Sequence, residues 1–256
     1  MGETKTAIYY NHNFYYDFSH IISADDRAIQ FGEGAYEWIR IHHGHSFGLS
    51  YHTDRLYRSM RLLGIRPVTA PDEFTEIVEV VVEESEIEEG YVKIIVTRGS
   101  DDHNFTIPAR SALQPNVLVY GKPIDLNAIE KVQSGVNCIT LDDDRGHHCD
   151  ILSLNQLNNM MARAEAQKKN CYDAVFIKDG LLTEASHSNV CIVKAGVIWT
   201  PATNEHMIRG VTRSLVLTRA APSAGVTSID EASEPVRFED MMTAEEVFLT
   251  NSQDGI

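Results

Sequence analysis

The apolar residues of this chain fall in short runs that alternate between the spacing of strands and the spacing of helices. Tyr91–Thr97 and Asn116–Tyr120 are short β-rich runs, whereas Tyr51–Leu63 has its apolar residues three and four positions apart, as in a helix. Strands and helices mixed in this way predict an α+β fold. Gly121-Lys122-Pro123 then interrupts the pattern. We therefore predict a smaller N-terminal α+β domain over residues 1–120, a linker over 121–125, and a larger C-terminal domain over 126–256.

The remaining pattern supplies elements for both domains. In the first, Ile8–Tyr10 and Phe14–Tyr16 flank a turn-rich tripeptide and predict a hairpin, and Pro71 opens a helix that runs to about Ser85. In the second, helices are expected over Leu154–Lys169 and from Gly210 to a stop at Pro222, and strands over Gly135–Leu141, Ala174–Ile177, Leu181–Glu184, Val190–Val193, Val197–Thr200 and Val247–Thr250.

The charge balance excludes some partners. The formal net charge is -15, so nucleic acid and anionic membrane surfaces are not expected to bind. No run of about 18 apolar residues is present, and the first residues lack the apolar core of a signal peptide. The four cysteines form no CxxC pair and are too few for a disulfide framework. We therefore expect a protein of the reducing cytoplasm.

Histidine clusters invite a metal hypothesis, which we consider weaker than the alternative. His42 and His43 are adjacent, and strand alternation would send them to opposite faces. His147, His148 and Cys149 also lack zinc-ligand spacing. Exposed or hydrogen-bonded histidines are the favoured interpretation, and no metal is expected. The sequence also lacks the G-x-S-x-G, GxxxxGK[ST] and HExxH motifs, and Gly32-Glu33-Gly34 is incomplete as a dinucleotide loop.

Short motifs spread along the chain form a stronger signal than any one of them alone. They are Gln30-Phe31-Gly32-Glu33-Gly34, Asp54-Arg55-Leu56, Thr97-Arg98-Gly99, Asp150-Ile151-Leu152-Ser153-Leu154-Asn155, Thr183-Glu184-Ala185-Ser186-His187-Ser188-Asn189, Gly210-Val211-Thr212-Arg213 and Phe248-Leu249-Thr250-Asn251-Ser252. In this order and spacing the set resembles class IV (fold-type IV) pyridoxal-phosphate aminotransferases, which include D-amino-acid and branched-chain aminotransferases and aminodeoxychorismate lyase. The resemblance covers nearly the whole chain and is closest to D-amino-acid aminotransferases. It implies a two-domain architecture with the cofactor between the domains.

The motifs suit a phosphorylated pyridine aldehyde. Gly210-Val211-Thr212 starts a helix, whose N–H groups and positive dipole end favour a phosphate. The hydroxyls of Thr212 and Ser252 can add hydrogen bonds, and Arg55 would supply charge, the alternative for Arg55 being an ion pair with Asp54 or Glu37. By the resemblance, Glu184 pairs with the pyridine nitrogen and Ile208 packs on the ring. The alternatives are a solvated carboxylate and a simple core residue.

The main departure from the family is at residue 152. The family has Asp-Ile-Lys-Ser-Leu-Asn, whose lysine forms the Schiff base and moves a proton, but this chain has Leu152 there. Leucine can do neither. Three explanations are open: a natural non-catalytic relative, an engineered lysine replacement, or a modified lysine transcribed as leucine. Because the cofactor-holding residues look intact, we favour an active ancestral chemistry with the lysine replaced or miswritten.

The resemblance implies transamination between an amino acid, which can be a D-amino acid, and a 2-oxo acid. The enzyme would use pyridoxal 5'-phosphate and form a homodimer. The substrate side would include Tyr36, Arg98, His103 and His187. The Arg-x-His carboxylate trap of D-amino-acid aminotransferases aligns with His103 and Phe105, so that trap is altered, and Arg98 or a cationic His103 is the expected substitute. The alternatives are an aminodeoxychorismate-lyase-like enzyme and a non-catalytic cofactor binder. Family members continue beyond the position of Ser252, so a C-terminal segment is expected to be missing here.

Overall fold

The chain folds into two compact units, which are not simple halves of the sequence. A computed structural model describes residues 6–19, 21–101, 105–107, 113–229 and 235–256. The first unit comprises residues 1–126 together with 151–155, and the second comprises 127–150 and 156–256. Two segments therefore differ from expectation. The expected linker begins as a strand, because Gly121 to Pro123 pair with the neighbouring strand. Residues 151–155, expected in the second domain, belong to the first unit.

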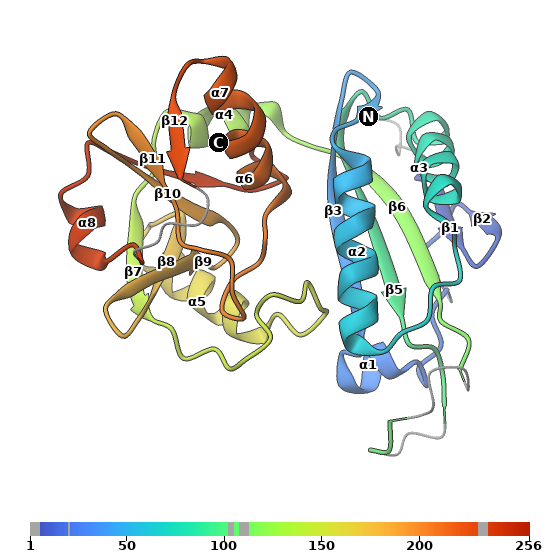
Figure 1. Cartoon of the computed structure of the whole chain (residues 1–256). Coiled ribbons are helices and arrows are strands. Elements are labelled where there is room, and N and C mark those ends of the chain that lie inside the picture. The colour runs from blue at the N-terminus through green and yellow to red at the C-terminus, as the bar shows by residue number, and fades with distance from the viewer. Residues whose placement is uncertain (1–5, 20, 102–104, 108–112, 230–234) are drawn as a thin grey trace. The chain divides into compact units, whose positions relative to one another are not determined.

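The first unit is an antiparallel sheet with helices on one face (Figure 1). Its elements are β1 (Ile8–Tyr10), β2 (Asn13–Tyr15), α1 (Arg27–Phe31), β3 (Gly34–His42), β4 (His45–Ser46), α2 (Leu49–Leu63), α3 (Pro71–Glu84), β5 (Glu89–Thr97) and β6 (Val117–Pro123). Six strands are paired in the order β2-β1-β6-β5-β3-β4. The predicted hairpin at the start of the chain and both predicted helices are confirmed.

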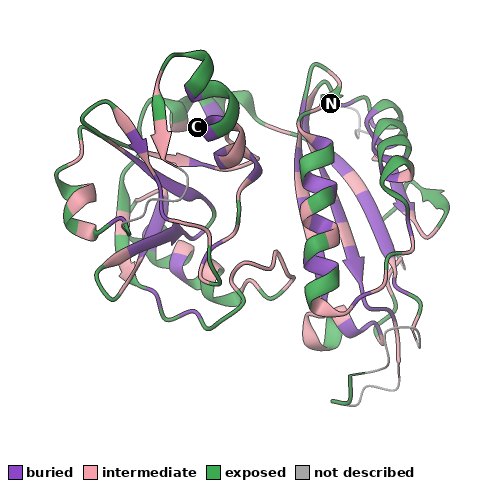
Figure 2. Cartoon of the chain, viewed as in Figure 1, coloured by how far each residue is buried: buried purple, intermediate pink, exposed green. Residues whose placement is uncertain are grey.

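Alternation along the strands builds the core of this unit. In β3, Ala35, Ile39 and Ile41 are fully buried, whereas Tyr36 and Trp38 between them are only partly buried. Successive strand residues point to opposite faces, so one face of the sheet packs against α2 and α3 and the other carries the aromatic residues. Figure 2 shows the same division in the helices, whose buried residues form a stripe along one side. The apolar side chains of these helices and of the inner strands form one continuous cluster.

The second unit contains two small sheets. Its elements are α4 (Leu126–Gln133), β7 (Cys138–Asp142), α5 (Leu157–Lys168), β8 (Asp173–Lys178), β9 (Leu181–Ala185), β10 (Asn189–Lys194), β11 (Val197–Trp199), α6 (Val211–Leu215), the π-helical turn η1 (Val216–Ala220), α7 (Ala221–Ser223), β12 (Thr227–Ile229), α8 (Phe238–Met242) and β13 (Glu246–Thr250). One sheet has the order β7-β8-β9 and the other β12-β11-β10-β13. Small residues of α5, Ala162 and Ala166, pack on Ala174 and Phe176 of β8.

Two helix boundaries differ from the predicted ones for identifiable reasons. α5 begins at Leu157 and not at Leu154, because residues 152–154 form a short antiparallel pairing with β3. The helix that starts at Val211 passes through η1 and ends at Ser223, one residue beyond Pro222. Proline is tolerated there because it occupies the first turn of α7. Within the described ranges, every helix is too short or too polar to span a lipid bilayer.

Candidate functional site

Residue 152 lies beside the N-terminal end of β3. The N–H of Tyr36 donates to the Leu152 carbonyl at 3.1 Å, and the N–H of Leu154 donates to the Gly34 carbonyl at 3.0 Å. On its other side, the Leu152 N–H donates to the hydroxyl oxygen of Ser59 on α2 at 3.3 Å. The backbone of residue 152 is thus fixed within the first unit by both a strand and a helix. Whatever side chain stands here is therefore held in a defined place.

The Gly32-Glu33-Gly34 motif makes room for this segment. A Cβ atom at Gly34 would lie 2.6 Å from a methyl carbon of Leu154, and one at Gly32 would lie 2.2 Å from the Asn155 side-chain oxygen. Gly32 also has a left-handed φ of 68° where it ends α1. The two glycines are explained by close packing of the 152–155 segment.

Arg55 is held by a buried carboxylate on β3. Its Nε and Nη2 atoms donate to the two oxygens of Glu37 at 2.8 and 2.7 Å, and His52 Nδ1 lies 2.7 Å from the same carboxylate. Burial raises the pKa of Glu37, but Arg55 and His52 outweigh burial and hold that pKa below its ordinary value. Glu37 is thus the ion-pair partner that the sequence offered as an alternative, and Asp54 is exposed. The phosphate role of Arg55 stays a prediction.

The expected substrate-side residues are not equivalent in the structure. Tyr36 lies on the face of the sheet that the helices leave uncovered. Arg98 is buried: its Nε donates to Glu33 at 2.7 Å, and its other nitrogens donate to the carbonyls of Leu63 and Gly64. With its guanidinium fixed in this way, Arg98 ties α2 to the end of β5 and is poorly suited to bind a substrate.

The structure gives little support for a residue that would replace the Arg-x-His carboxylate trap. His103 lies outside the described residues. The side chain of Phe105 is 91% exposed, and its ring centroid lies 5.2 Å from that of Phe31. His187, between β9 and β10, is exposed. The structure therefore leaves the substrate roles of His103 and His187 as predictions.

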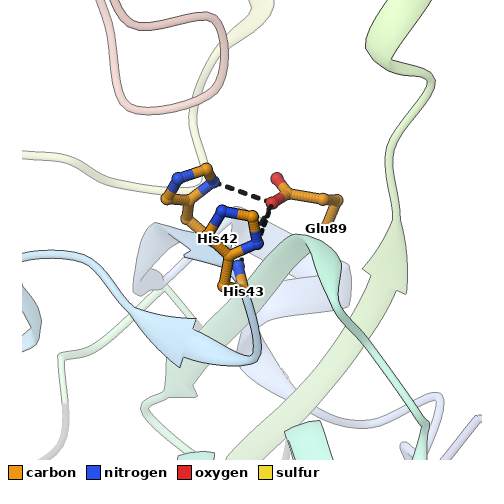
Figure 3. Close-up of side chains that lie close together, drawn as sticks. All are labelled: His42, His43 and Glu89. Carbon is orange, nitrogen blue, oxygen red and sulfur yellow. Dashed lines mark hydrogen bonds and ion pairs between the residues drawn. The ribbon is translucent and has the colours of Figure 1, made fainter.

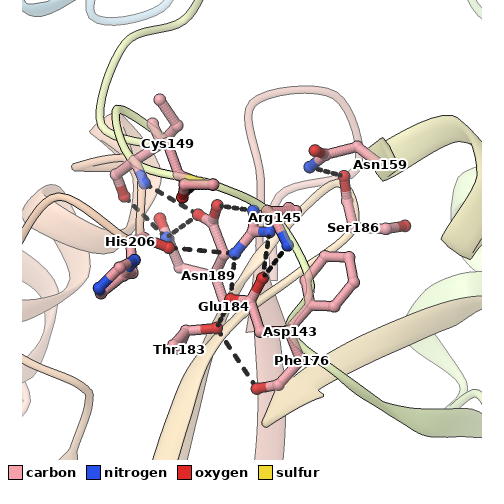
Figure 4. A network of polar contacts seen from close by, with 12 residues as sticks. Asp143, Arg145, Cys149, Asn159, Phe176, Thr183, Glu184, Ser186, Asn189 and His206 are labelled. Atoms are coloured by element: carbon pink, nitrogen blue, oxygen red, sulfur yellow. Dashed lines mark hydrogen bonds and ion pairs between the residues drawn. The ribbon is translucent and has the colours of Figure 1, made fainter. Parts of the chain in front are cut away.

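Glu184 is the centre of a buried polar network in the second unit (Figure 4). Its Oε1 accepts a hydrogen bond from Arg145 at 2.6 Å. Its Oε2 accepts from the backbone N–H of Ile208 at 2.9 Å and from the side-chain amide of Asn189 at 3.3 Å. The same amide also donates to the Ile208 carbonyl at 2.8 Å. Asn189 thereby fixes the carboxylate of Glu184 and the backbone of Ile208 relative to each other, which brings two predicted site residues together.

Burial dominates the electrostatics of Glu184. It raises the pKa of this carboxyl to about 7, although Arg145 and the Ile208 N–H act in the opposite direction. Arg145 also contacts Asp143 through Nε at 2.9 Å and Nη2 at 2.8 Å, and these charge-assisted bonds raise the pKa of Arg145 against the effect of burial. The same guanidinium holds the pKa of Asp143 below its usual value, despite burial. A cation placed beside Glu184 would favour its ionised form.

The sequence interpretation missed Arg145 and Asp143. Asp143 also accepts a hydrogen bond from the hydroxyl of Thr183 at 2.8 Å, which connects it to the Glu184 strand. The acidic run Asp142-Asp143-Asp144, followed by Arg145 at the end of β7, is the sequence signal that could have indicated them. Their partner Glu184 is far away in the sequence, so the pairing itself could not be read from a pattern.

Of the predicted phosphate-binding residues, those of the second unit lie together at the start of α6, whereas Arg55 belongs to the first unit. The Thr212 hydroxyl donates to the carbonyl of Asn251 at 2.9 Å, which places Val211 and Thr212 beside the turn that contains Ser252. Gly210, the residue before the helix, touches Asn189: a Cβ atom there would lie 2.0 Å from the Asn189 side-chain oxygen. The Glu184 network and the start of α6 are thus adjacent in the second unit.

The two serines of the Glu184 motif have a structural role. The hydroxyls of Ser186 and Ser188 both bind the buried carboxylate of Asp173 on β8, and Ser188 also accepts a hydrogen bond from Asn251 at 3.2 Å. These contacts fix the turn between β9 and β10, which positions Glu184 before it and Asn189 after it.

One histidine cluster approaches a carboxylate, contrary to the argument from strand alternation. His43 follows β3 with a left-handed φ of 48°, so its ring turns back beside that of His42. The Nδ1 atoms of His42 and His43 lie 2.7 and 3.6 Å from Glu89 (Figure 3). These three residues offer donor atoms within 4.8 Å of one another, as a metal ion would require. Glu89 already pairs with Arg40, however, and we assign no metal role to the exposed cluster.

Comparison with known proteins identifies the family. The profile of the family "Amino-transferase class IV" matches residues 34–256. A D-alanine aminotransferase of Bacillus licheniformis is 36% identical over 231 residues, which cover 90% of this chain and 79% of the relative. The chain therefore belongs to the class IV aminotransferase family.

Solved structures show the same fold. A branched-chain aminotransferase of Thermoproteus uzoniensis, determined with norvaline, superposes with a TM-score of 0.87 at 22% identity over 98% of this chain and 84% of that one. A hypothetical aminotransferase of Mycobacterium tuberculosis in a PLP-bound form gives a TM-score of 0.85 at 22% identity over 97% of this chain and 88% of that one. The architecture is therefore that of fold-type IV aminotransferases, as the sequence motifs predicted.

Proposed function

We propose that the chain binds pyridoxal phosphate and that its chemistry is transamination between a D-amino acid and a 2-oxo acid. Family membership and the D-alanine aminotransferase of Bacillus licheniformis support this reaction class. The observation that carries the proposal is the Glu184 carboxylate, which is 5% exposed and fixed by Arg145, Asn189 and the Ile208 N–H. Such a carboxylate suits a cationic ring nitrogen in a defined position.

The second unit also presents a polar atom that a ligand would satisfy. The hydroxyl of Thr250 is buried and has no hydrogen-bond partner among the described residues. Thr250 lies directly opposite Asn189 in the antiparallel β10–β13 pair, so both side chains are on one face of that sheet. A buried hydroxyl without a partner is costly, and a phosphate or a bound water would remove that cost. The residues present therefore fit the cofactor.

Each residue of this site would have a separate task. Bound pyridoxal phosphate would supply an aldehyde and an electron-withdrawing ring. Glu184 would hold the proton on the ring nitrogen, and Ile208 would pack on the ring. The N–H groups of Val211 and Thr212, with the hydroxyl of Ser252, would bind the phosphate. By the family resemblance Arg55 adds charge to the same phosphate. Leu152 provides neither an amine nor a proton carrier.

The proposed substrate rests on the similarity to the D-alanine aminotransferase of Bacillus licheniformis. The proposed substrate side rests on the face of the first sheet that α2 and α3 leave uncovered. We assign Tyr36 to the substrate side because it lies on that face beside residue 152. We do not assign Arg98, because its guanidinium is taken by Glu33 and two carbonyls. The family resemblance further supports a homodimer in the cytoplasm. Light scattering on the purified protein would give the mass of the oligomer.

A binding experiment with pyridoxamine phosphate tests this function without requiring an imine. Saturable binding, followed by cofactor fluorescence, is the expected result. Thr212→Val should weaken binding, because it changes the start of α6, whereas Thr218→Val on the same helical run, whose hydroxyl bonds only to Ser214 within the run, should not. A folded protein that shows no saturable binding would refute the proposal.

Turnover tests the reaction class. Glu184→Gln should lower turnover per bound cofactor more than it lowers cofactor retention, because Glu184 is assigned to the ring and not to the phosphate. Glu205→Gln, a change at an exposed carboxyl, is the control. A panel of D- and L-amino acids, followed by 2-oxo acid formation in a Leu152→Lys background, would give the substrate. Release of pyruvate from aminodeoxychorismate alone would move the function to the lyase.

A further inference from the structure

The turn that follows β13, the 251–255 turn, is organised by its first residue. The N–H of Asn251 donates to the Gly255 carbonyl at 3.0 Å, and the N–H of Gly255 donates back to the Asn251 carbonyl at 3.2 Å. The side-chain oxygen of Asn251 accepts hydrogen bonds from the N–H groups of Gln253 and Asp254 at 2.8 and 2.7 Å. Ser252, whose hydroxyl is assigned to the phosphate, therefore lies within a closed turn.

An acidic residue in this turn is unfavourable for phosphate binding and calls for an explanation. Asp254 follows Ser252 by two residues, and a carboxylate near a phosphate repels it. The carboxylate is occupied, however, by two hydrogen bonds. Its Oδ2 accepts one from the phenol of Tyr172 and a second from the side-chain amide of Asn251, the latter at 3.2 Å. Asp254 thus connects the 251–255 turn to the segment that contains Tyr172.

Tyr172 is itself anchored in the second unit. It stands directly before β8, where its N–H donates to the Asn137 carbonyl at 2.7 Å, and the guanidinium carbon of Arg163 on α5 lies 4.9 Å from its ring centroid. Burial raises the pKa of the Tyr172 phenol, and the hydrogen bond to Asp254 raises it further, so the phenol keeps its proton and remains a donor. The side chain of Tyr172 therefore fastens the 251–255 turn to β8 and α5.

The same turn is joined to the groups assigned to the phosphate. The Asn251 carbonyl accepts a hydrogen bond from the hydroxyl of Thr212, at the start of α6, at 2.9 Å. The Asn251 amide also donates to the hydroxyl oxygen of Ser188, between β9 and β10, at 3.2 Å. Among the residues that the structure describes, the Ser252 hydroxyl makes no hydrogen bond, so it is available to a ligand. A displacement of the 251–255 turn would therefore affect Ser252 and Thr212 together.

We propose that Tyr172 and Asp254 are positioning residues, whose contact holds the 251–255 turn in the place where Ser252 binds the phosphate of the cofactor. The inference deepens the proposed function and rests on it. Neither residue is assigned a contact with the phosphate itself. Loss of the contact removes the phenol donor from the Asp254 carboxylate and releases the turn from β8. The effect falls on the phosphate end of the ligand and spares its ring.

Two ligands that differ only in the phosphate group test this inference. Pyridoxamine phosphate has the ring and the phosphate, whereas pyridoxamine has the ring alone. Tyr172→Phe keeps the aromatic ring beside Arg163 and should weaken binding of pyridoxamine phosphate by about fivefold, the size expected for one hydrogen bond, without changing the binding of pyridoxamine. Inorganic phosphate, added as a competitor, should lose affinity to a similar extent. Tyr57→Phe removes a phenol hydrogen bond to the Thr69 carbonyl in the first unit and should change none of these affinities.

Asp254→Ala adds a test in which the sign of the effect decides. If the charge of Asp254 acted alone, its removal would strengthen the binding of pyridoxamine phosphate. The positioning role predicts weaker binding instead, and the effects of Asp254→Ala and Tyr172→Phe should be less than additive in the double variant, because both changes remove the same contact. Glu184→Gln, at the ring end of the site, should leave the ratio of the two ligand affinities unchanged. Circular dichroism checks that each variant is folded.

The outcomes separate this inference from the proposed function. Saturable binding of pyridoxamine phosphate to the wild type, with the same affinity in Tyr172→Phe or a higher affinity in Asp254→Ala, overturns the positioning role and leaves the proposed function intact. A loss of equal size for pyridoxamine phosphate and pyridoxamine also overturns the positioning role, since the change would then not be specific to the phosphate. Absence of saturable binding to the folded wild type overturns the proposed function and this inference with it.

Discussion

The guanidinium of Arg145 lies 2.6 Å from the carboxylate of Glu184, and both side chains are buried. Arg145 also binds Asp143, so two carboxylates share one guanidinium. When both acids are ionised, the buried group therefore carries one net negative charge. A protonated pyridine nitrogen beside Glu184 would cancel that charge. Burial of the group raises the pKa of Glu184, and a cation beside its carboxylate would lower that pKa.

Arg145→Met should destabilise the protein strongly. The change removes the partner of Glu184 and Asp143 and leaves buried acids without a cation, which typically costs about 3–5 kcal/mol of the free energy of unfolding. Urea unfolding at neutral pH measures the loss. Arg219→Met, on the exposed side of η1, should change the free energy by less than about 0.5 kcal/mol. Equal stability of the two variants would show that Arg145 does not neutralise the buried acids.

The stability of the cofactor-free protein should depend on Glu184 in a defined pH window. Its folded-state pKa is raised from 4.5 to about 7, so between these values the folded state binds the proton more strongly than the unfolded state does. The free energy of unfolding therefore falls as the pH rises through the window and levels off above about 7.

Glutamine does not titrate, so a Glu184→Gln variant lacks the pH dependence that Glu184 contributes. Comparing the wild type with this variant therefore isolates the contribution of Glu184. The stability of the wild type minus that of Glu184→Gln should fall by a few kcal/mol between pH 4.5 and 8, since each unit of pKa shift corresponds to about 1.4 kcal/mol. Urea unfolding across the pH range gives the difference, with Glu205→Gln as the control. A difference that stays constant with pH would show that the pKa of Glu184 is not raised.

Leu152→Lys should give the protein an efficient proton carrier. The backbone at 152 is fixed by Tyr36 and Ser59, so a lysine there enters a prepared position. Because nucleophilic and acid–base effects are each worth roughly 10²–10⁴-fold, transamination should increase by at least about 100-fold. Leu152→Arg, which is cationic but cannot form an imine, should give no gain. Stopped-flow absorbance and 2-oxo acid formation are the measurements. A cofactor-loaded Leu152→Lys protein with no gain would show that residue 152 is not the family's lysine position.

Gly34→Ala should disturb the segment that contains residue 152. The new methyl group would lie 2.6 Å from a carbon of Leu154 and 2.8 Å from the backbone oxygen of Val96, and overpacking of this kind typically costs about 1–3 kcal/mol. Gly146→Ala is the control, since nothing lies within 4 Å of the added atom. Thermal unfolding compares the two, and hydrogen exchange at Tyr36 should become faster only in Gly34→Ala. Similar melting temperatures would contradict the packing described for β3.

Local patterns in the sequence were sufficient to predict most of the helices and strands. The Asp179-Gly180 turn predicted a hairpin, and both residues have left-handed φ values, 52° and 78°, as such a turn requires. Apolar spacing likewise gave α2, α3 and the start of α6 at Val211. The family and its fold could be recognised because motifs with these local roles occur in a fixed order.

The features that were missed depend on contacts between distant residues. Arg145 meets Glu184 across 39 residues, and no periodicity connects them. The pairing of segment 151–155 with β3 is a single bridge, Ala35 to Ser153, too short to leave a strand pattern.

The return of residues 151–155 to the first unit affects how the chain can be divided and synthesised. A fragment that ends at Leu126 would leave the N–H of Tyr36 and the carbonyl of Gly34 unpaired at the edge of β3. During translation, the first sheet cannot complete this edge until Asn155 has left the ribosome, by which time α4 and β7 of the second unit have already emerged. The two units are therefore expected to mature together, and neither can be excised with one cut.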